Sequence, residues 1–287
     1  MTRRVSLCLM SLLIASCAPE AGESTDAGRN DWINLFNGEN LSGWDTYLGP
    51  ETLDTSGTEA PALGLNNDPD GVFSVVVEDS LPVIRISGTV GGGLSTVPAF
   101  ENYHLSLEFK WGDEEWWPSK TIRDSGLLYH AVGPHAADWN FWMRSQEFQI
   151  QVGDCGDYWG VAGAAFDVPS RKRSDGLYVY DPAGEMHSFS RKSEIGRHCI
   201  KNPNGEKPVG EWNILELYVY EGMAVHIVNG VVTMILYNSR QLEADSELPL
   251  TKGKIQLQSE GAEIFYRDLR LRTIDSIPES ILGKASA

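Results

Sequence analysis

Apolar and polar residues alternate along much of this chain with a period of two, which is the pattern of β-strands that bury one face. Glycine, proline and asparagine separate the runs, and Asn229-Gly230 predicts a hairpin because a type I′ turn needs positive φ at both central residues. No long amphipathic helix is expected, so the sequence predicts an all-β protein. The predicted strands are Val72–Val77, Val83–Ser87, His104–Trp111, Gly126–Val132, Glu147–Gln151, Leu177–Tyr180, Ile214–Tyr220, Ala224–Val228, Val231–Tyr237, Lys254–Gln258 and Ile264–Leu271.

An all-β chain of this size must bury its strands as two sheets packed face to face, and a single domain of that kind is normal at this length. No internal repeat and no linker to a second domain is visible. Asp167–Gly210 differs from the rest, because it is polar, interrupted by proline and glycine, and has one obvious strand. We expect it to be a long excursion over one rim, and such excursions often shape a site.

Polar residues occupy every second position of the predicted strand that begins at Glu147. Side chains alternate along a strand, so Glu147, Gln149 and Gln151 share one face while Phe148 and Ile150 share the other. The first face can hold a ligand and the second can pack in a core. Sugar hydroxyls both donate and accept hydrogen bonds, so a row of amides and carboxylates suits a polyhydroxylated ligand.

A second strand near the C-terminus repeats this arrangement. Gln256, Gln258 and Glu260 share one face, and the residues between them form the other. Tryptophans are frequent between Trp111 and Trp159, and an indole can stack on the apolar face of a pyranose. The two polar rows and the nearby tryptophans together predict a carbohydrate site.

The N-terminus has the pattern of a secretory signal. Met1–Ser16 contains two arginines, a short apolar run and small residues directly before Cys17. A cysteine at the first mature position resembles a bacterial lipobox, so we expect Cys17 to carry a lipid and 17–30 to form a flexible tether. An ordinary signal peptide with an incidental cysteine is the alternative. The apolar run is too short to span a bilayer.

Net charge limits the possible binding partners, and cysteine content limits the possible disulfides and metal sites. The formal net charge is −17, so the general field of the protein excludes nucleic acid and anionic lipid as partners. Cys155 and Cys199 remain after the leader and the lipidated cysteine are set aside, and in an oxidising compartment we favour a disulfide between them over two free buried thiols. No Cys/His cluster has zinc spacing, and we expect no resident cofactor, although a divalent cation stays open.

Several motifs follow one another in order along the chain: Leu35–Trp44, Gly91–Thr96, Asn102–Leu105 with Glu108–Trp111, Asp124–His130, Glu147–Ile150, Gly210–Asn213, His226–Gly230 and Gly253–Gly261. Together they resemble the 3-keto-disaccharide hydrolase domain family between Trp32 and about Arg272. One departure is Asp124, where many members have asparagine. The resemblance implies an all-β, concanavalin-like jelly-roll sandwich of two antiparallel sheets with a concave sugar-binding face, occupying 31–274 and followed by a tail over 275–287.

The activity implied by this family can be compared with the residues present. Ordinary glycosidases need two carboxylates at the bond, and jelly-roll glucanases carry them as Glu-x-Asp-x-Glu, whereas here the run is Glu147-x-Gln149-x-Gln151. Cleavage of a 3-keto sugar needs only one base, because the ketone acidifies the C2 proton and that base can start elimination of the C1 substituent. Adding water to the enone gives net hydrolysis; otherwise the reaction ends as a lyase. Donors or a divalent cation would stabilise the enolate.

Candidate site residues follow from the strand faces and from the family motifs. Tyr129 and His130 have opposite parity in a regular strand, so we expect one of them in the cleft and favour His130 over a structural histidine. The candidate catalytic residues are Glu147, His130 and Asp124, and the expected substrate contacts are Gln149, Gln256, Gln258, Glu260, Arg267, Tyr129, Trp117 and Trp159.

Each candidate has a structural alternative. Glu147 could only bind a hydroxyl, the glutamines could form an amide ladder, Glu260 could end its strand in solvent, and Arg267 could pair with an acid. Trp116-Trp117 beside a proline are hard to bury together, so we expect one or both as a sugar platform. Asn66–Gly71 lacks EF-hand spacing and predicts a turn rather than a calcium site. His226 precedes the predicted hairpin and is expected to be structural.

Three functions remain at this point. The favoured one is a lipid-anchored enzyme of the bacterial cell envelope, facing the periplasm or the exterior, that cleaves 3-keto-glycosides after a separate oxidoreductase has made the ketone. The chain itself has no dinucleotide fingerprint. The alternatives are a non-catalytic carbohydrate-binding module and a conventional glycoside hydrolase in which Asp124 or Glu260 supplies the second carboxylate.

Overall fold

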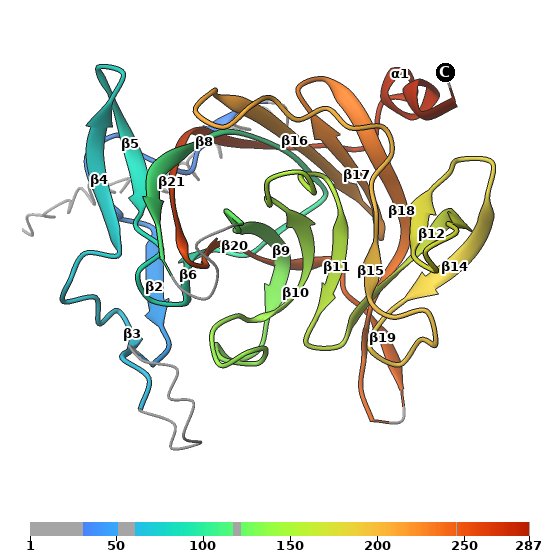
Figure 1. The fold of residues 1–287 in the computed structure, drawn as a ribbon, viewed down its shortest axis with the longest axis horizontal. Helices are drawn as coiled ribbons and strands as arrows, with labels where there is room; N and C mark the ends of the chain where they lie inside the picture. Colours follow the sequence, from blue (N-terminus) through green and yellow to red (C-terminus); the bar gives the residue numbers. More distant parts are fainter. Residues whose placement is uncertain (1–30, 51–60, 117–121, 245, 287) are drawn as a thin grey trace, which may run out of the picture.

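The computed structural model describes residues 31–50, 61–116, 122–244 and 246–286, and these residues form two antiparallel sheets packed as a jelly-roll sandwich (Figure 1). The predicted all-β fold class is therefore confirmed. The larger sheet contains β1 (Ile33–Asn34), β4 (Phe73–Glu78), β5 (Leu81–Ile86), β8 (Tyr103–Glu115), β12 (Ala164–Lys172), β13 (Tyr178–Tyr180), β14 (Glu185–Phe189), β16 (Asn213–Tyr220), β17 (Met223–Val228), β18 (Val231–Leu242), β19 (Glu247–Pro249) and β21 (Ala262–Thr273).

The smaller sheet carries the two polar rows. Its strands run in the spatial order β15-β11-β10-β9-β20-β6-β2-β3, with β7 paired to β20. The bounds are β2 (Trp44–Leu48), β3 (Gly64–Leu65), β6 (Gly92–Thr96), β7 (Phe100–Glu101), β9 (Gly126–Val132), β10 (Arg144–Gln149), β11 (Tyr158–Val161), β15 (His198–Cys199) and β20 (Lys252–Ser259). A short helix α1 (Glu279–Leu282) and a 3₁₀ turn (Gly283–Ser286) follow the last strand. None of the described helices is long and apolar enough to cross a membrane.

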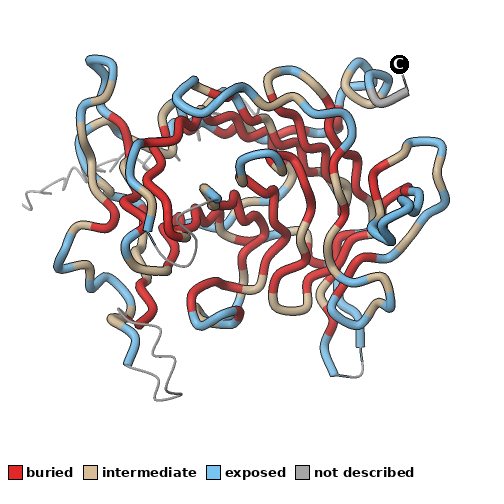
Figure 2. The backbone as a smooth tube through the Cα atoms, viewed as in Figure 1, coloured by how far each residue is buried: buried red, intermediate tan, exposed pale blue. Residues whose placement is uncertain are grey.

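The core lies between the sheets, where the buried segments concentrate (Figure 2). Phe148 and Ile150 of the Glu147 strand are fully buried there, as the alternation predicts. His226 stacks on Phe148 with ring centroids 4.1 Å apart and hydrogen-bonds the Tyr129 hydroxyl at 3.0 Å, so the expectation that it is structural is confirmed. The inward face of the smaller sheet is thus packed, and its polar residues are directed away from the core.

The local turn predictions agree with the structure. Asn229 and Gly230 have φ of 51° and 80° and connect β17 to β18. In the segment Asn66–Gly71, the Asp68 carboxylate accepts from the backbone amides of Val72 and Phe73 at 2.8 Å each, which explains a turn without a metal.

The polar segment Asp167–Gly210 forms more strand than its sequence predicts. β12, β13 and β14 extend the larger sheet, and β15 adds an edge to the smaller one. Most of β12 is buried despite its charged C-terminal end, because it pairs with strands on both sides. The segment therefore joins both sheets, and the turn before β15 reaches the polar face of the smaller sheet.

Candidate active site

The site face of the smaller sheet, meaning the face turned away from the core, carries the polar side chains in rows across the strands. Residues directly opposite each other on antiparallel strands share a face. Glu147 on β10 is opposite Trp159 on β11, and Trp159 is opposite His198 on β15. In the next row Gln149 is opposite Gly126 of β9. These pairings place an aromatic ring beside the Glu147 carboxylate.

Gly126 makes room for the central contact of the site. A Cβ atom at this position would collide with the Oε1 atoms of Glu147 and Gln258, which come from the strands on either side. The Gln258 side-chain amide hydrogen-bonds the Glu147 carboxylate in that space. Glycine at 126 therefore allows a carboxylate and an amide from different strands to converge.

Glu147 is held in an environment that favours its neutral form. Its residue is 7% exposed, and burial raises the pKa of the carboxyl to about 8, with the nearby Asp124 carboxylate adding to the rise. The Arg197 guanidinium and the Gln258 hydrogen bond act in the opposite direction but do not cancel it. A carboxyl with this pKa can accept and release a proton near neutral pH, as a general base or acid must.

Asp124 and Glu260 complete a cluster of three carboxyl groups. The two residues form an isolated β-bridge, which joins the segment before β9 to the end of β20. Burial raises the pKa of Asp124 to about 7, while the Ser125 amide lowers it. Burial and the charges of Asp124 and Glu147 raise the pKa of Glu260 well above its usual range. The cluster therefore retains a proton near neutral pH, because like charges this close cannot all be ionised.

Two amide oxygens beside the cluster have no protein partner among the described residues. Gln149 donates through Nε2 to Asp124 at 3.0 Å, but its Oε1 accepts nothing. The Oε1 of Gln258 is also buried and unpartnered. Buried acceptors are nearly always satisfied in folded proteins. Hydroxyl groups of a bound sugar are donors that would satisfy them.

Trp159 is fixed by its neighbours on the same face. His198 stacks on the indole with centroids 4.2 Å apart and an interplanar angle of 9°, and Nε2 of His198 bonds the buried Asp157 carboxylate at 2.7 Å. The Arg197 guanidinium lies 5.4 Å from the same indole. Trp159 thus borders the carboxyl cluster, and part of its surface is already covered by these side chains.

Sequence reasoning missed Arg197 and its anchor, Asp138. Asp138 is 4% exposed and pairs with two arginines, Arg191 and Arg197, the latter at 2.6 Å. Arg197 is the one described cation whose charge lowers the pKa of both Glu147 and Glu260. The only sequence signal for it was its place in the polar segment predicted to shape a site.

His130 and Tyr129 lie in the core rather than in the site. The expectation for His130 assumed a regular strand, but β9 has register shifts toward both neighbours and His130 has a φ of 52°. This bulge turns both rings inward: the His130 ring makes edge contacts with Tyr103 and Tyr129, and burial lowers its pKa to about 4. The structure therefore does not bring His130 to the carboxyl cluster.

Gln256 and Arg267 also have structural partners. Gln256 accepts from the Met143 amide at 3.1 Å and donates to Ser95 at 2.8 Å, so it anchors the chain that enters β10. Arg267 belongs to the larger sheet and pairs with Glu108 at 2.7 Å while lying over Trp212. The alternative expected for Arg267, an arginine paired with an acid, describes what the structure shows, whereas Gln256 bonds a backbone amide and a serine rather than other amides in a ladder.

Of the other predicted residues, the two cysteines differ from the expectation, and two residues lie outside the described part of the chain. Cys155 and Cys199 are both free and buried, so the expected disulfide is absent, and burial raises the pKa of both thiols. Gln151 donates to Asp154 at 2.8 Å. Cys17 and Trp117 lie outside the described residues. Within the described ranges, no group of three His, Cys, Asp or Glu side chains has the geometry to hold a metal ion.

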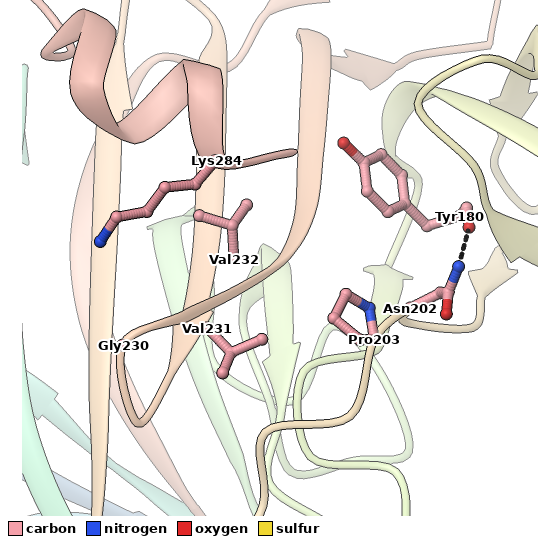
Figure 3. A pocket seen from close by; sticks show the side chains of 7 residues that line it. All are labelled: Tyr180, Asn202, Pro203, Gly230, Val231, Val232 and Lys284. Carbon is pink, nitrogen blue, oxygen red and sulfur yellow. Dashed lines mark hydrogen bonds between the residues drawn. The ribbon is translucent and has the colours of Figure 1, made fainter. Parts of the chain in front are cut away.

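A cavity of about 240 Å³ lies elsewhere in the molecule, between the start of β18, the end of β13 and the C-terminal turn (Figure 3). Its lining is mainly apolar side chains and backbone, and Lys284 is its one charged residue. The Asn202 amide at its edge donates to the Tyr180 carbonyl at 3.3 Å. It contains none of the site residues and offers no acid–base pair.

Comparison with known proteins identifies the family. The family model of the 3-keto-alpha-glucoside-1,2-lyase-like domain matches residues 31–272. A 3-keto-disaccharide hydrolase from Bacteroides thetaiotaomicron is 22% identical over 273 residues, covering 85% of this chain and 79% of that protein.

Similar solved structures are more distant. A protein from Parabacteroides distasonis, described as a glycosyl hydrolase, is 18% identical with a TM-score of 0.47, covering 85% of this chain and 100% of its own. A carbohydrate-binding module from Bacillus subtilis is 6% identical with a TM-score of 0.39, covering 70% and 92%. At these scores neither adds to the functional argument. The family match confirms the resemblance seen in the sequence motifs, and the names of the family and of the Bacteroides relative suggest a glycoside-cleaving enzyme: the chain belongs to the 3-keto-alpha-glucoside-1,2-lyase-like family.

Proposed function

We propose that this protein is an enzyme that cleaves 3-keto-glycosides by elimination, with Glu147 as the base at C2. The observation that carries the proposal is the buried Glu147 carboxyl, whose pKa is raised to about 8 in a cluster with Asp124 and Glu260. Strongly raised carboxyl pKa values in a polar cleft are typical of groups that transfer protons. The family and the Bacteroides relative support the substrate class.

The proposed reaction needs one base and one acid. In its ionised form Glu147 takes the proton from C2, the C–H electrons form the C1=C2 double bond conjugated with the C3 ketone, and the bond from C1 to the departing oxygen breaks. Glu260 gives its proton to that oxygen, because its pKa is raised well above the usual range. Addition of water across the double bond returns a free 3-keto sugar and completes a net hydrolysis.

The residues around the cluster have matching roles in this proposal. The unpartnered oxygens of Gln149 and Gln258 accept hydrogen bonds from sugar hydroxyls. The positive charge of Arg197 lowers the pKa of Glu147 and of Glu260, and it therefore favours the ionised form of the base. Trp159 forms an apolar wall beside the reacting ring.

The proposal is tested by comparing a glycoside with its 3-keto derivative. Purified protein is incubated with each compound, and release of the aglycone is followed. Cleavage of the 3-keto compound alone is the expected result, because an unoxidised sugar has no acidic C2 proton. Equal cleavage of both would support a conventional glycosidase, and binding without cleavage of either would support a carbohydrate-binding module.

We also propose that the protein is anchored by a lipid on Cys17 at the bacterial cell envelope and receives its substrate from a separate oxidoreductase. The support is the sequence Ile14-Ala15-Ser16 before Cys17 and the requirement for a ketone that elimination imposes. Replacing Cys17 with alanine should release the protein from the membrane fraction. A variant that fractionates with membranes as the wild type does would contradict the anchor.

A further inference from the structure

The hairpin between β9 and β10 presents a tryptophan at its tip. Trp139 is 65% exposed, whereas Phe141 and Trp142, which follow it closely, are each 7% exposed. A single exposed apolar residue is common and needs no explanation by itself. The backbone and the surroundings of Trp139 make this one different.

The backbone at the tip is unfavourable for a bulky side chain. Trp139 and Asn140 have φ of 52° and 64°, and the tip is closed by bonds from the Phe141 and Trp142 amides to the Asp138 carbonyl at 2.9 and 3.1 Å. Glycine, asparagine and aspartate are the usual residues where a tight turn needs positive φ. Asn140 fits this preference and Trp139 does not, so the indole occupies a strained position.

The base of the hairpin is rigid, so the strain is not relieved by loose packing. The Asp138 carboxylate holds Arg191 and Arg197 and accepts from the Ala162 amide at 3.2 Å. Trp142 donates through Nε1 to the Gly92 carbonyl at 3.0 Å. The Phe141 ring lies so close to the backbone of Gly49 and Gly91 that neither position could hold a side chain without movement.

The hairpin stands on the same face as the carboxyl cluster. Phe141 and Trp142 pack on Leu128 and Val161, and Leu128 is directly opposite Glu147 across the strand pair. Asp138, at the base of the hairpin, pairs with Arg197, and the Arg197 guanidinium lies over the Trp159 indole beside the cluster. Trp139, which directly follows Asp138, is therefore on the site face, in a hairpin whose other residues contact the surroundings of the carboxyl cluster.

We propose that Trp139 is the platform for a second sugar ring, the one joined to the 3-keto ring in a disaccharide substrate. This rests on the proposed function for the position of the reacting ring. A pyranose has an apolar face that an indole covers well, and a platform held in advance by a rigid hairpin loses little freedom when the sugar binds. The ligand class is a disaccharide or longer saccharide rather than a glycoside with a small aglycone.

The test replaces Trp139 with glycine, which accepts positive φ without strain. With the wild type and the variant, kcat and KM are measured for a 3-keto-disaccharide and for the methyl glycoside of the same 3-keto sugar. We expect the preference for the disaccharide, taken as the ratio of kcat/KM values, to fall about tenfold through KM. The midpoint of thermal unfolding should stay the same or rise, because the strain is removed. Leu177→Ala, which truncates another exposed apolar residue, is the control.

The outcomes separate a platform from a structural role. A fall in thermal stability with equal losses for both substrates would mean that Trp139 only supports the hairpin, and an unchanged preference would also overturn the proposal. Calorimetric titration with the unoxidised disaccharide keeps the test independent of catalysis. If the wild type cleaves no 3-keto substrate, the proposed function fails, and weaker disaccharide binding by Trp139→Gly still supports the platform while equal binding contradicts it.

Discussion

The carboxyl groups on the two outward faces of the sandwich have opposite environments: those on the larger sheet pair with arginines, and those on the smaller sheet are buried without an ion-pair partner in the described part of the chain. On the larger sheet Glu108 pairs with Arg267 at 2.7 Å and Glu263 pairs with Arg85 at 2.6 Å. On the smaller sheet Asp124, Glu147 and Glu260 form no ion pair among the described residues, and burial raises the pKa of all three. Paired surface charges contribute little to stability. Burying carboxyl groups that have no ion-pair partner costs stability, and groups shifted in this way are typical of sites that transfer protons.

The comparison predicts that replacing a glutamate with glutamine lowers activity strongly on the smaller sheet and little on the larger one. Glu147→Gln keeps the shape of the side chain but removes the base, so cleavage of a 3-keto-glycoside should fall by roughly 10²-fold or more. Binding of the unreacted sugar should change little. The measurement is steady-state kinetics with calorimetric binding. Glu108→Gln on the larger sheet is the matched control, and a loss of similar size in that variant would remove the distinction between the faces.

A second prediction separates the two arginines that share Asp138. Arg197→Gln should raise the pKa of Glu147 further, because the nearby positive charge is lost. The rise of kcat/KM with pH, which follows ionisation of the base, should therefore move to higher pH, and activity at pH 7 should fall about threefold to tenfold. Arg191→Gln removes a partner of the same carboxylate, and Arg191 is not among the groups that shift the Glu147 pKa most. Identical pH profiles for the two variants would show that Arg197 acts only through Asp138.

A third prediction concerns stability rather than activity. The Glu147 pKa is about 8 in the folded protein, against 4.5 as its ordinary value. The folded state therefore holds a proton that the unfolded state has lost, so this group destabilises the fold as pH rises from about 4.5 through 8. Glu147→Gln should gain stability relative to the wild type at pH 9 compared with pH 4, on the order of 5 kcal/mol. Denaturant unfolding at both pH values measures the gain, and a gain that is equal at both would contradict the raised pKa.

The sequence predicted the faces of the strands but not the irregularities that complete the site. Period-two alternation correctly assigned Glu147 and Phe148 to opposite faces, because that pattern depends only on local geometry. The same rule was wrong for His130, because a bulge adds a residue that no local pattern reveals. The pairing of Cys155 with Cys199 also required a distance and direction that spacing along the chain does not give.

Long-range contacts were the other source of missed residues. Arg197 reaches the cluster from the polar segment through Asp138, which is 59 positions away along the chain. An ion pair of this separation leaves no signature in either segment. Trp139 was noticed only as one of many tryptophans, since its unusual backbone angle is visible only in the fold.

The central claim, that Glu147 removes the C2 proton of a 3-keto sugar, is tested most directly by solvent deuterium exchange. The wild type and Glu147→Gln are incubated with a 3-keto-glycoside in D₂O, and recovered substrate and product are examined by mass spectrometry and NMR. The account predicts deuterium at C2 with the wild type and little or none with Glu147→Gln. Cleavage by the wild type without deuterium at C2 in either compound, or equal deuterium with both proteins, would contradict it.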